Sequence, residues 1–141
     1  MTNEEKKKLI LTNLEKYTLG VISTIHENNT PEAAVIGISQ KDNLELIFDT
    51  FIESRKYKNI KSNPRVAIVV GWDDNITIQF EGIATELREV EREEYLQIHL
   101  VKIPSEIHFI KKGATLFKVI PKWVRFSDFR KEPSEIFELY F

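Results

Sequence analysis

Short apolar segments separated by turn-forming residues are the feature that most restricts the fold of this 141-residue chain. The turns fall at Asn28–Pro31, Lys41–Asn43 and Asp73–Asn75, which carry the residue types that favour tight connections between strands. The segment Ile76–Leu87 opens with strict alternation of apolar and polar residues, the period of a strand with one buried face. Consecutive strands joined by tight turns run antiparallel. The chain is therefore predicted to be mainly β, with an antiparallel sheet.

Six strands and three helices account for the rest of the pattern. The predicted strands are Leu19–Glu27, Ala33–Ser39, Leu44–Thr50, Arg65–Trp72, Ile76–Leu87 and Ala114–Phe129, the last broken or bulged at Pro121. The predicted helices begin near Asn3, where Thr2 and Glu5 have capping-box spacing, after Ser54, and at Val90–Lys102. Long sequential strands favour a small closed barrel over an open sandwich. The apolar tail Pro133–Phe141 is expected to pack on this barrel or on a second subunit.

The composition is that of an ordinary folded domain, with 42% hydrophobic and 30% charged residues and a net charge of −2. We expect one domain over residues 1–141. The absence of cysteine excludes disulfides and thiolate metal sites and suits a cytoplasmic protein. The sequence has neither a signal-peptide pattern nor an apolar run of roughly 20 residues, so we expect no membrane partner. The near-neutral charge argues against a general attraction to nucleic acid.

The start of the second helix has an unusual charge pattern. Ser54 is the expected N-cap residue, and Arg55 and Lys56 follow in the first turn. The helix dipole disfavours cations there by ~0.3–1 kcal/mol each. A bound anion would offset this cost, because free backbone N–H groups, a hydroxyl and two cations would converge on it. The alternative is that both cations point into water or pair with a carboxylate such as Glu53.

The segment Asp49–Ala67, DTFIESRKYKNIKSNPRVA, resembles the signature of the pyridoxamine 5′-phosphate oxidase-like FMN-binding split barrels. From about Leu19 to Phe129 the chain is similar to the general-stress-protein branch of that superfamily, with Gly82 inside the fifth strand. The resemblance implies a six-stranded antiparallel Greek-key split barrel that forms a homodimer, with FMN in each cleft between the subunits. It also implies that the FMN phosphate is held by Thr50, Ser54, Arg55 and Lys56.

Further cofactor-binding residues follow from the same resemblance. Asp49 stands where an aromatic or small residue of the family lies against the flavin. Thr77 and Gln79, on one face of the fifth strand, are positions that present a polar group to the flavin ring. The last strand carries Trp123, Arg125 and Ser127 on one face, where they would stack on the flavin or border the substrate. The alternative for these three is a packed interface tryptophan beside an exposed arginine.

Two departures from the family pattern bear on the substrate. The oxidases carry an arginine and a lysine for cofactor and substrate on the second strand, whereas this chain has Ala34 and Ser39 there. The R-x-H-D-R element with which the oxidases grip pyridoxal phosphate has no counterpart after Asp128. The resemblance therefore implies a flavin site without the vitamin B6 phosphate site, and argues against pyridoxamine phosphate oxidation.

We expect an FMN-dependent oxidoreductase whose chemistry is carried by the cofactor. Its small-molecule substrate and its electron donor are not specified by the residues. One alternative is a flavin-binding stress or sensor protein without turnover, which would use the same residues. A second alternative is the same barrel binding a deazaflavin or haem.

Two other groups of polar residues bear on a nucleic-acid site and on a metal site. Five cations lie between Arg55 and Arg65, which would suit RNA or single-stranded DNA, but Tyr57 is the only aromatic residue among them. Single-stranded nucleic acid needs exposed aromatic platforms, so this alternative is disfavoured. His26, His99 and His108 are too scattered for metal-ligand spacing, and surface or capping roles are expected for them. We therefore expect neither nucleic acid nor a metal.

Overall fold

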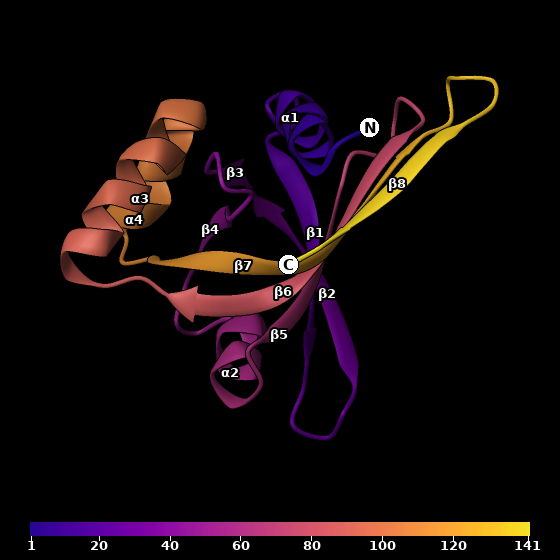
Figure 1. Cartoon of the computed structure of the whole chain (residues 1–141). Helices are drawn as coiled ribbons and strands as arrows, with labels where there is room; N and C mark the ends of the chain where they lie inside the picture. Colours follow the sequence, from indigo (N-terminus) through magenta and orange to yellow (C-terminus); the bar gives the residue numbers. More distant parts are fainter.

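The computed structural model describes residues 1–141 as a curled antiparallel sheet with helices packed around it (Figure 1). The strands are β1 (Leu19–Ile25), β2 (Pro31–Gly37), β3 (Ser39–Gln40), β4 (Leu46–Thr50), β5 (Arg65–Val70), β6 (Ile76–Glu86), β7 (Thr115–Asp128) and β8 (Glu135–Tyr140). The helices are α1 (Asn3–Leu14), α2 (Arg55–Ser62), α3 (Glu89–Lys102) and α4 (Ile107–Lys111), with a 3₁₀ turn, η1, at Pro104–Glu106. The predicted split barrel is confirmed.

The predicted strand count of six is wrong, because the sheet has eight strands. The predicted strand Ala33–Ser39 divides at Ile38, where the chain changes partner: β2 pairs with β1, whereas β3 pairs with β4. Ile38 is buried at this corner, and its N–H group donates to the carbonyl of Thr18 instead of to a strand. The other additional strand is β8, which forms from the apolar tail.

The sheet has the order β2-β1-β5-β6-β7-β4-β3, and β8 pairs with β7. β7 is the longest strand, and β6 follows it along one edge. On its other edge, the first part of β7 pairs with β4 and the last part pairs with β8. β2 and β4 also contact each other, which closes the curl of the sheet. The tail therefore packs on the barrel, as expected from its apolar sequence.

Large aromatic side chains fill the inside of the barrel. Phe48, Phe80, Phe117 and Phe126 are fully buried, and Phe48 stacks on Phe117 with ring centroids 5.2 Å apart. Burying such a side chain stabilises the fold by ~1.5–3 kcal/mol. Because successive residues of a strand point to opposite faces, the residues between these aromatic ones face outward. The core therefore determines which side chains of β6 and β7 a ligand or partner could reach.

A bulge interrupts the pairing of β6 with β7 where the sequence predicts a break. Glu81 pairs with Trp123 and Gly82 pairs with Pro121, so Lys122 is the extra residue. Gly82 lies so close to β7 that a β-carbon there would collide with the carbonyl oxygen of Ile120. The bulge lets Lys122 and Trp123 both face away from the core.

The helices begin where their capping signals predict. Thr2 and Glu5 form the capping box of α1, and Ser54 caps α2. Helix α3 covers the outer face of β4 through a second, smaller apolar cluster of Ile47, Leu87, Tyr95, Leu96 and Leu116. The turn η1 and helix α4, which follow α3, were not predicted. No helix has both the length and the apolar character needed to cross a bilayer.

Candidate functional site

Two hydroxyl groups organise the start of α2. The Ser54 hydroxyl accepts the backbone N–H of Tyr57 at 3.3 Å and donates to the carbonyl of Phe51 at 2.8 Å. The hydroxyl of Thr50, at the end of β4, lies 2.8 Å from the Ser54 hydroxyl and must be the donor, because the Ser54 proton is already used. Both hydroxyls therefore hold the turn that precedes the helix. Of the four predicted phosphate ligands, this leaves the two cations as the free hydrogen-bond donors.

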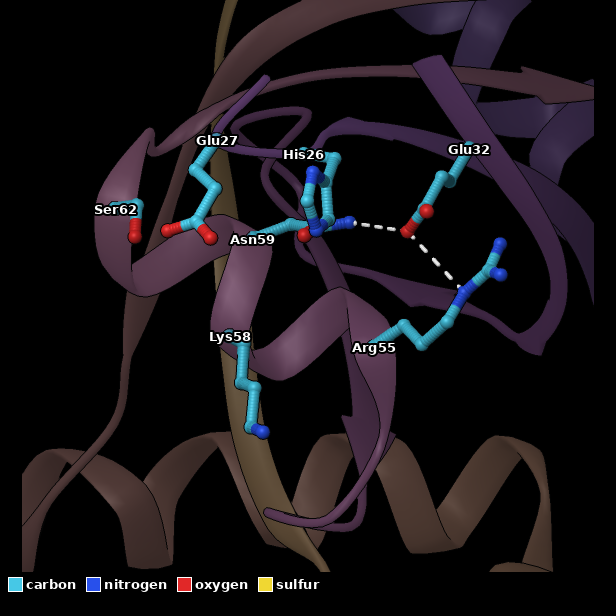
Figure 2. A pocket seen from close by; sticks show the side chains of 7 residues that line it. All are labelled: His26, Glu27, Glu32, Arg55, Lys58, Asn59 and Ser62. Carbon is cyan, nitrogen blue, oxygen red and sulfur yellow. Dashed lines mark hydrogen bonds and ion pairs between the residues drawn. The ribbon is translucent and has the colours of Figure 1, made fainter. Parts of the chain in front are cut away.

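Arg55 is mostly exposed, with 76% of its side chain accessible, and it is held from one side only. Its Nε lies 3.2 Å from Oε1 of Glu32, which comes from the start of β2. The same Glu32 oxygen accepts from Nδ2 of Asn59 at 2.8 Å, and that amide also donates to the Thr24 hydroxyl at 3.0 Å. Figure 2 shows the terminal nitrogens of the guanidinium lying beyond the contact with Glu32. The arginine is thus oriented but keeps donors for a ligand.

Lys56 is half-buried beside Asp49, and this burial lowers the pKa of its ammonium group, while the charge of Asp49 acts in the opposite direction. Burial of a cation without a full partner is unfavourable, and an incoming anion would reverse that effect. Lys56 and Arg55 both line a cavity of about 200 Å³ whose other walls are Ile22, Thr24, Glu32, Ala33 and Ala34. The structure therefore brings the two predicted cations to one cavity.

A larger cavity of about 390 Å³ adjoins the first and shares Arg55 and Glu32 with it (Figure 2). It is lined only by polar and charged residues: His26, Glu27, Glu32, Arg55, Lys58, Asn59 and Ser62. Glu32 lines both cavities and is the one carboxylate paired with Arg55. Any anion bound by Arg55 would therefore lie near a negative charge as well as two positive ones.

The five predicted residues of β6 and β7 form a second group. Thr77 pairs with Ser127, and Gln79 pairs with Arg125, so these side chains are cross-strand neighbours on the outer face. Trp123 lies one pair further along, opposite Glu81. Gln79 is exposed, whereas Ser127 is buried.

Within one chain the β6–β7 group is separate from the cavities beside α2. Thr50 pairs with Thr115 at the start of β7, and Trp123 is eight residues further along that strand. At ~3.3 Å per residue, Thr115 and Trp123 are roughly 25 Å apart along β7. Neither cavity beside α2 is lined by any of the five β6–β7 residues. One chain therefore does not bring all ten predicted cofactor residues together.

Asp49 and Ser39 are both hydrogen-bonded to His99. Ser39 and Ala34 stand where the oxidases have cations. Oδ2 of Asp49 lies 2.9 Å from Nε2 of His99, and Nδ1 of His99 lies 2.6 Å from the Ser39 hydroxyl. His99 is completely buried, so the expectation of a surface or capping role for it is wrong. Ser39 is also buried and is committed to this histidine. Ala34, by contrast, lines the smaller cavity beside Lys56.

Three residues around the predicted site were missed from sequence: Glu32 pairs with Arg55, Asn59 donates to Glu32, and Glu106 interacts with Asp49. Glu32 is brought to Arg55 and Asn59 of α2 by the packing of that helix against β1, which no local pattern indicates. His99 was detectable as a buried residue, because it continues the inward-facing positions Tyr95 and Leu96 at helical spacing. Its hydrogen-bond partners could not be read in this way.

A family model described as pyridoxamine 5′-phosphate oxidase matches residues 7–128. The chain therefore belongs to the pyridoxamine 5′-phosphate oxidase family. A curated relative, the pyridoxine/pyridoxamine 5′-phosphate oxidase of Escherichia fergusonii, is 34% identical over 55 residues. That match covers 39% of this chain and 25% of the relative, so the chain matches only about a quarter of the enzyme's length.

Solved structures with the same fold carry different descriptions. General Stress Protein 26 from Bacillus anthracis is 22% identical, with a TM-score of 0.68 and coverage of 98% of this chain and 100% of that one. A pyridoxamine 5′-phosphate oxidase-related, FMN-binding protein from Nostoc punctiforme is 14% identical, with a TM-score of 0.67 and coverages of 100% and 97%. A heme-binding protein from Mycobacterium smegmatis is 11% identical, with a TM-score of 0.80 and coverages of 99% and 59%. These similarities establish the fold.

Proposed function

We propose that this protein binds FMN through an anion site at the start of α2 and acts as a flavin-dependent oxidoreductase on a small molecule. The observation that carries the proposal is the pair Arg55 and half-buried Lys56, which line one cavity at a helix N-terminus. Backbone N–H groups of a first helical turn lack intrahelical partners and favour a phosphate. Membership of the pyridoxamine 5′-phosphate oxidase family supports the view that this phosphate is the phosphate of FMN.

The residues present fit an FMN phosphate. Arg55 and Lys56 would contact it directly, while Thr50 and Ser54 would hold the backbone that surrounds it. Glu32 would act as a positioning residue that fixes the Nε edge of Arg55 and leaves the terminal nitrogens for the phosphate. When bound, FMN would supply the electron-transfer chemistry, and the protein would supply binding and orientation.

A homodimer follows from the same proposal. Arg55 and Lys56 line a cavity beside α2, whereas Gln79 and Trp123 lie on the outer face of β6 and β7 and line neither cavity there. We propose that the two groups that hold one flavin come from different subunits. The cofactor would then lie in a cleft between two copies of the chain, and each copy would contribute to both clefts.

We propose a substrate other than pyridoxamine 5′-phosphate. A second phosphate needs its own cations, and the positions that provide them in the oxidases are Ala34 and the buried Ser39. Haem is the alternative cofactor, and the buried His99 is unsuited to bind its iron because both of its ring nitrogens are hydrogen-bonded, whereas His26 lines the larger cavity.

The test is to record visible spectra of the purified protein and then titrate it with FMN, FAD, haem and a deazaflavin. We expect FMN to bind and the other three to bind more weakly. A protein that binds none of the flavins contradicts the proposal. A haem spectrum would show that the cofactor is haem instead of FMN. Reduction of the bound FMN by NADH or NADPH would distinguish an oxidoreductase from a flavin-binding protein without turnover. Light scattering should give the mass of a dimer, and a monomer would contradict the shared cleft.

A further inference from the structure

A cluster of polar side chains lies between the outer face of β4 and the segment α3–η1. Asp49 comes from β4, His99 from the last turns of α3 and Glu106 from η1. One polar atom from each of these three side chains lies within 4.8 Å of the other two. Asp49 directly precedes Thr50, so the cluster adjoins the cofactor cleft proposed above.

Hydrogen bonds fix the position of Asp49. Nε2 of His99 lies 2.9 Å from Asp49, and because a carboxylate can only accept, this nitrogen carries the hydrogen. When the ring is neutral, Nδ1 then accepts from the Ser39 hydroxyl at 2.6 Å. His99 and Ser39 are both completely buried, so neither the ring nor the hydroxyl is free to turn toward water. Asp49 is therefore anchored from one side and leaves its other side to Glu106.

The absence of a side chain at Gly37 leaves room for the carboxyl group of Glu106. Glu106 lies over Gly37 of β2, where any β-carbon would collide with its carboxyl group. Burial raises the pKa of Glu106 to about 7, and its hydrogen bond with Asp49 and the charge of Asp49 act in the same direction. Two carboxyl groups within 4.8 Å of each other repel when both are ionised, which favours a proton on Glu106.

The charged groups around this pair come from two other elements, α3 and α2. His99 of α3 contacts Asp49 directly, and Lys56 of α2 lies close enough to Asp49 for its pKa to respond to that charge. Lys56 also lines the cavity in which we propose the FMN phosphate. A negative charge bound at Lys56 would therefore raise the pKa of the Glu106–Asp49 pair, so that the pair binds its proton more tightly.

We propose that Glu106 and Asp49 share a single proton and exchange it with solvent when the charge of the cofactor cleft changes, with His99 and Ser39 as positioning residues. The step moves only a proton: the protonated pair carries one negative charge, and its loss of the proton leaves two. Neither carboxyl group is oxidised or reduced. Such a pair can supply or accept a proton at neutral pH, as general acid–base catalysis requires. The cleft itself rests on the proposed function.

The shared proton can be tested in the protein without any cofactor. The ¹³C resonances of glutamate carboxyl groups are followed from pH 4 to pH 9 in the wild type and in Glu106→Gln, Asp49→Asn and Glu93→Gln. Glu93 is an exposed residue of α3 and provides the matched change of charge. We expect one carboxyl group to titrate near pH 7, to vanish in Glu106→Gln, to move to lower pH in Asp49→Asn and to persist in Glu93→Gln. Titration of Glu106 with the ordinary glutamates would overturn the proposal.

The link to the cleft is tested by proton uptake on FMN binding, measured by calorimetry at pH 7 in two buffers of different ionisation enthalpy. The wild type and Glu93→Gln should take up as much as about half a proton more than Glu106→Gln, since a group at its pKa is half protonated. Equal uptake by Glu106→Gln and the wild type would overturn the link. If FMN does not bind at all, the proposed function fails and the link fails with it, while the cofactor-free titration still decides whether the proton is shared.

Discussion

Removal of both cations at the start of α2 should weaken FMN binding without unfolding the protein. The change is the double substitution Arg55→Ala with Lys56→Ala. The matched control is Lys111→Ala with Lys112→Ala, which removes the same charge from an exposed segment around the end of α4. The control separates loss of a specific contact from a general change in net charge.

The size of the effect follows from the surroundings of each cation. A hydrogen bond to a charged group contributes ~1.5–3 kcal/mol, and the exposure of Arg55 argues for the lower end of that range. Lys56 is half-buried, so its contact with a phosphate is less weakened by water. Two contacts of ~1.5 kcal/mol each correspond to an affinity about 100-fold lower. The stability should change by less than ~1 kcal/mol, because the exposed pair of Arg55 with Glu32 is a surface ion pair.

The assay is a fluorescence titration with FMN, together with urea unfolding of the same proteins. We expect a loss of at least tenfold in affinity for the double variant, and no loss for the control. An FMN affinity unchanged in the double variant would refute the phosphate site at α2. An equal loss in the control would show that only the net charge matters.

Three further predictions concern the scaffold of the site. Gly82→Ala should lower the free energy of unfolding by ~1–3 kcal/mol, because its β-carbon would collide with the carbonyl of Ile120; calorimetry that shows an unchanged Tm would contradict the close approach of β6 and β7. Ser54→Ala should cost ~1–2 kcal/mol in urea unfolding through loss of the N-cap and of the acceptor for Thr50, and Ser54→Asp should recover part of that loss. The pKa of Glu106 is about 7 in the folded chain against an ordinary 4.5, so its proton stabilises the fold at low pH and this contribution is lost as pH rises through 7. Between about pH 5 and pH 8 the wild type should therefore lose ~1–2 kcal/mol relative to Glu106→Gln, a value reduced for partial exposure, and parallel pH profiles would contradict this.

The parts of the fold that depend on local chemistry were predictable from the sequence. The capping box at Thr2 and the N-cap at Ser54 act within a few residues, and both helices begin there. Strict alternation at the start of Ile76–Leu87 predicted a strand with one buried face, which β6 is. Pro121 indicated the bulge because proline cannot donate to a neighbouring strand.

The parts that depend on which elements meet in space were not predictable in this way. The change of partner at Ile38 leaves no local signal, since the residues on both sides of it read as one continuous strand. The contact of Glu32 with Arg55 and that of Glu106 with Asp49 each join elements remote in sequence. The site was therefore predictable where a contiguous motif carries it, and its carboxylate neighbours were found only in the structure.

The most direct test of the central claim compares FMN with riboflavin, which is the same flavin without the phosphate. Both affinities are measured by fluorescence titration of the cofactor-free wild-type protein at one pH and one salt concentration. If Arg55 and Lys56 hold the phosphate, FMN should bind about 100-fold more tightly than riboflavin, as two contacts of ~1.5 kcal/mol each predict. Affinities for the two flavins within about threefold of each other, less than ~0.7 kcal/mol, would contradict a phosphate site at the start of α2.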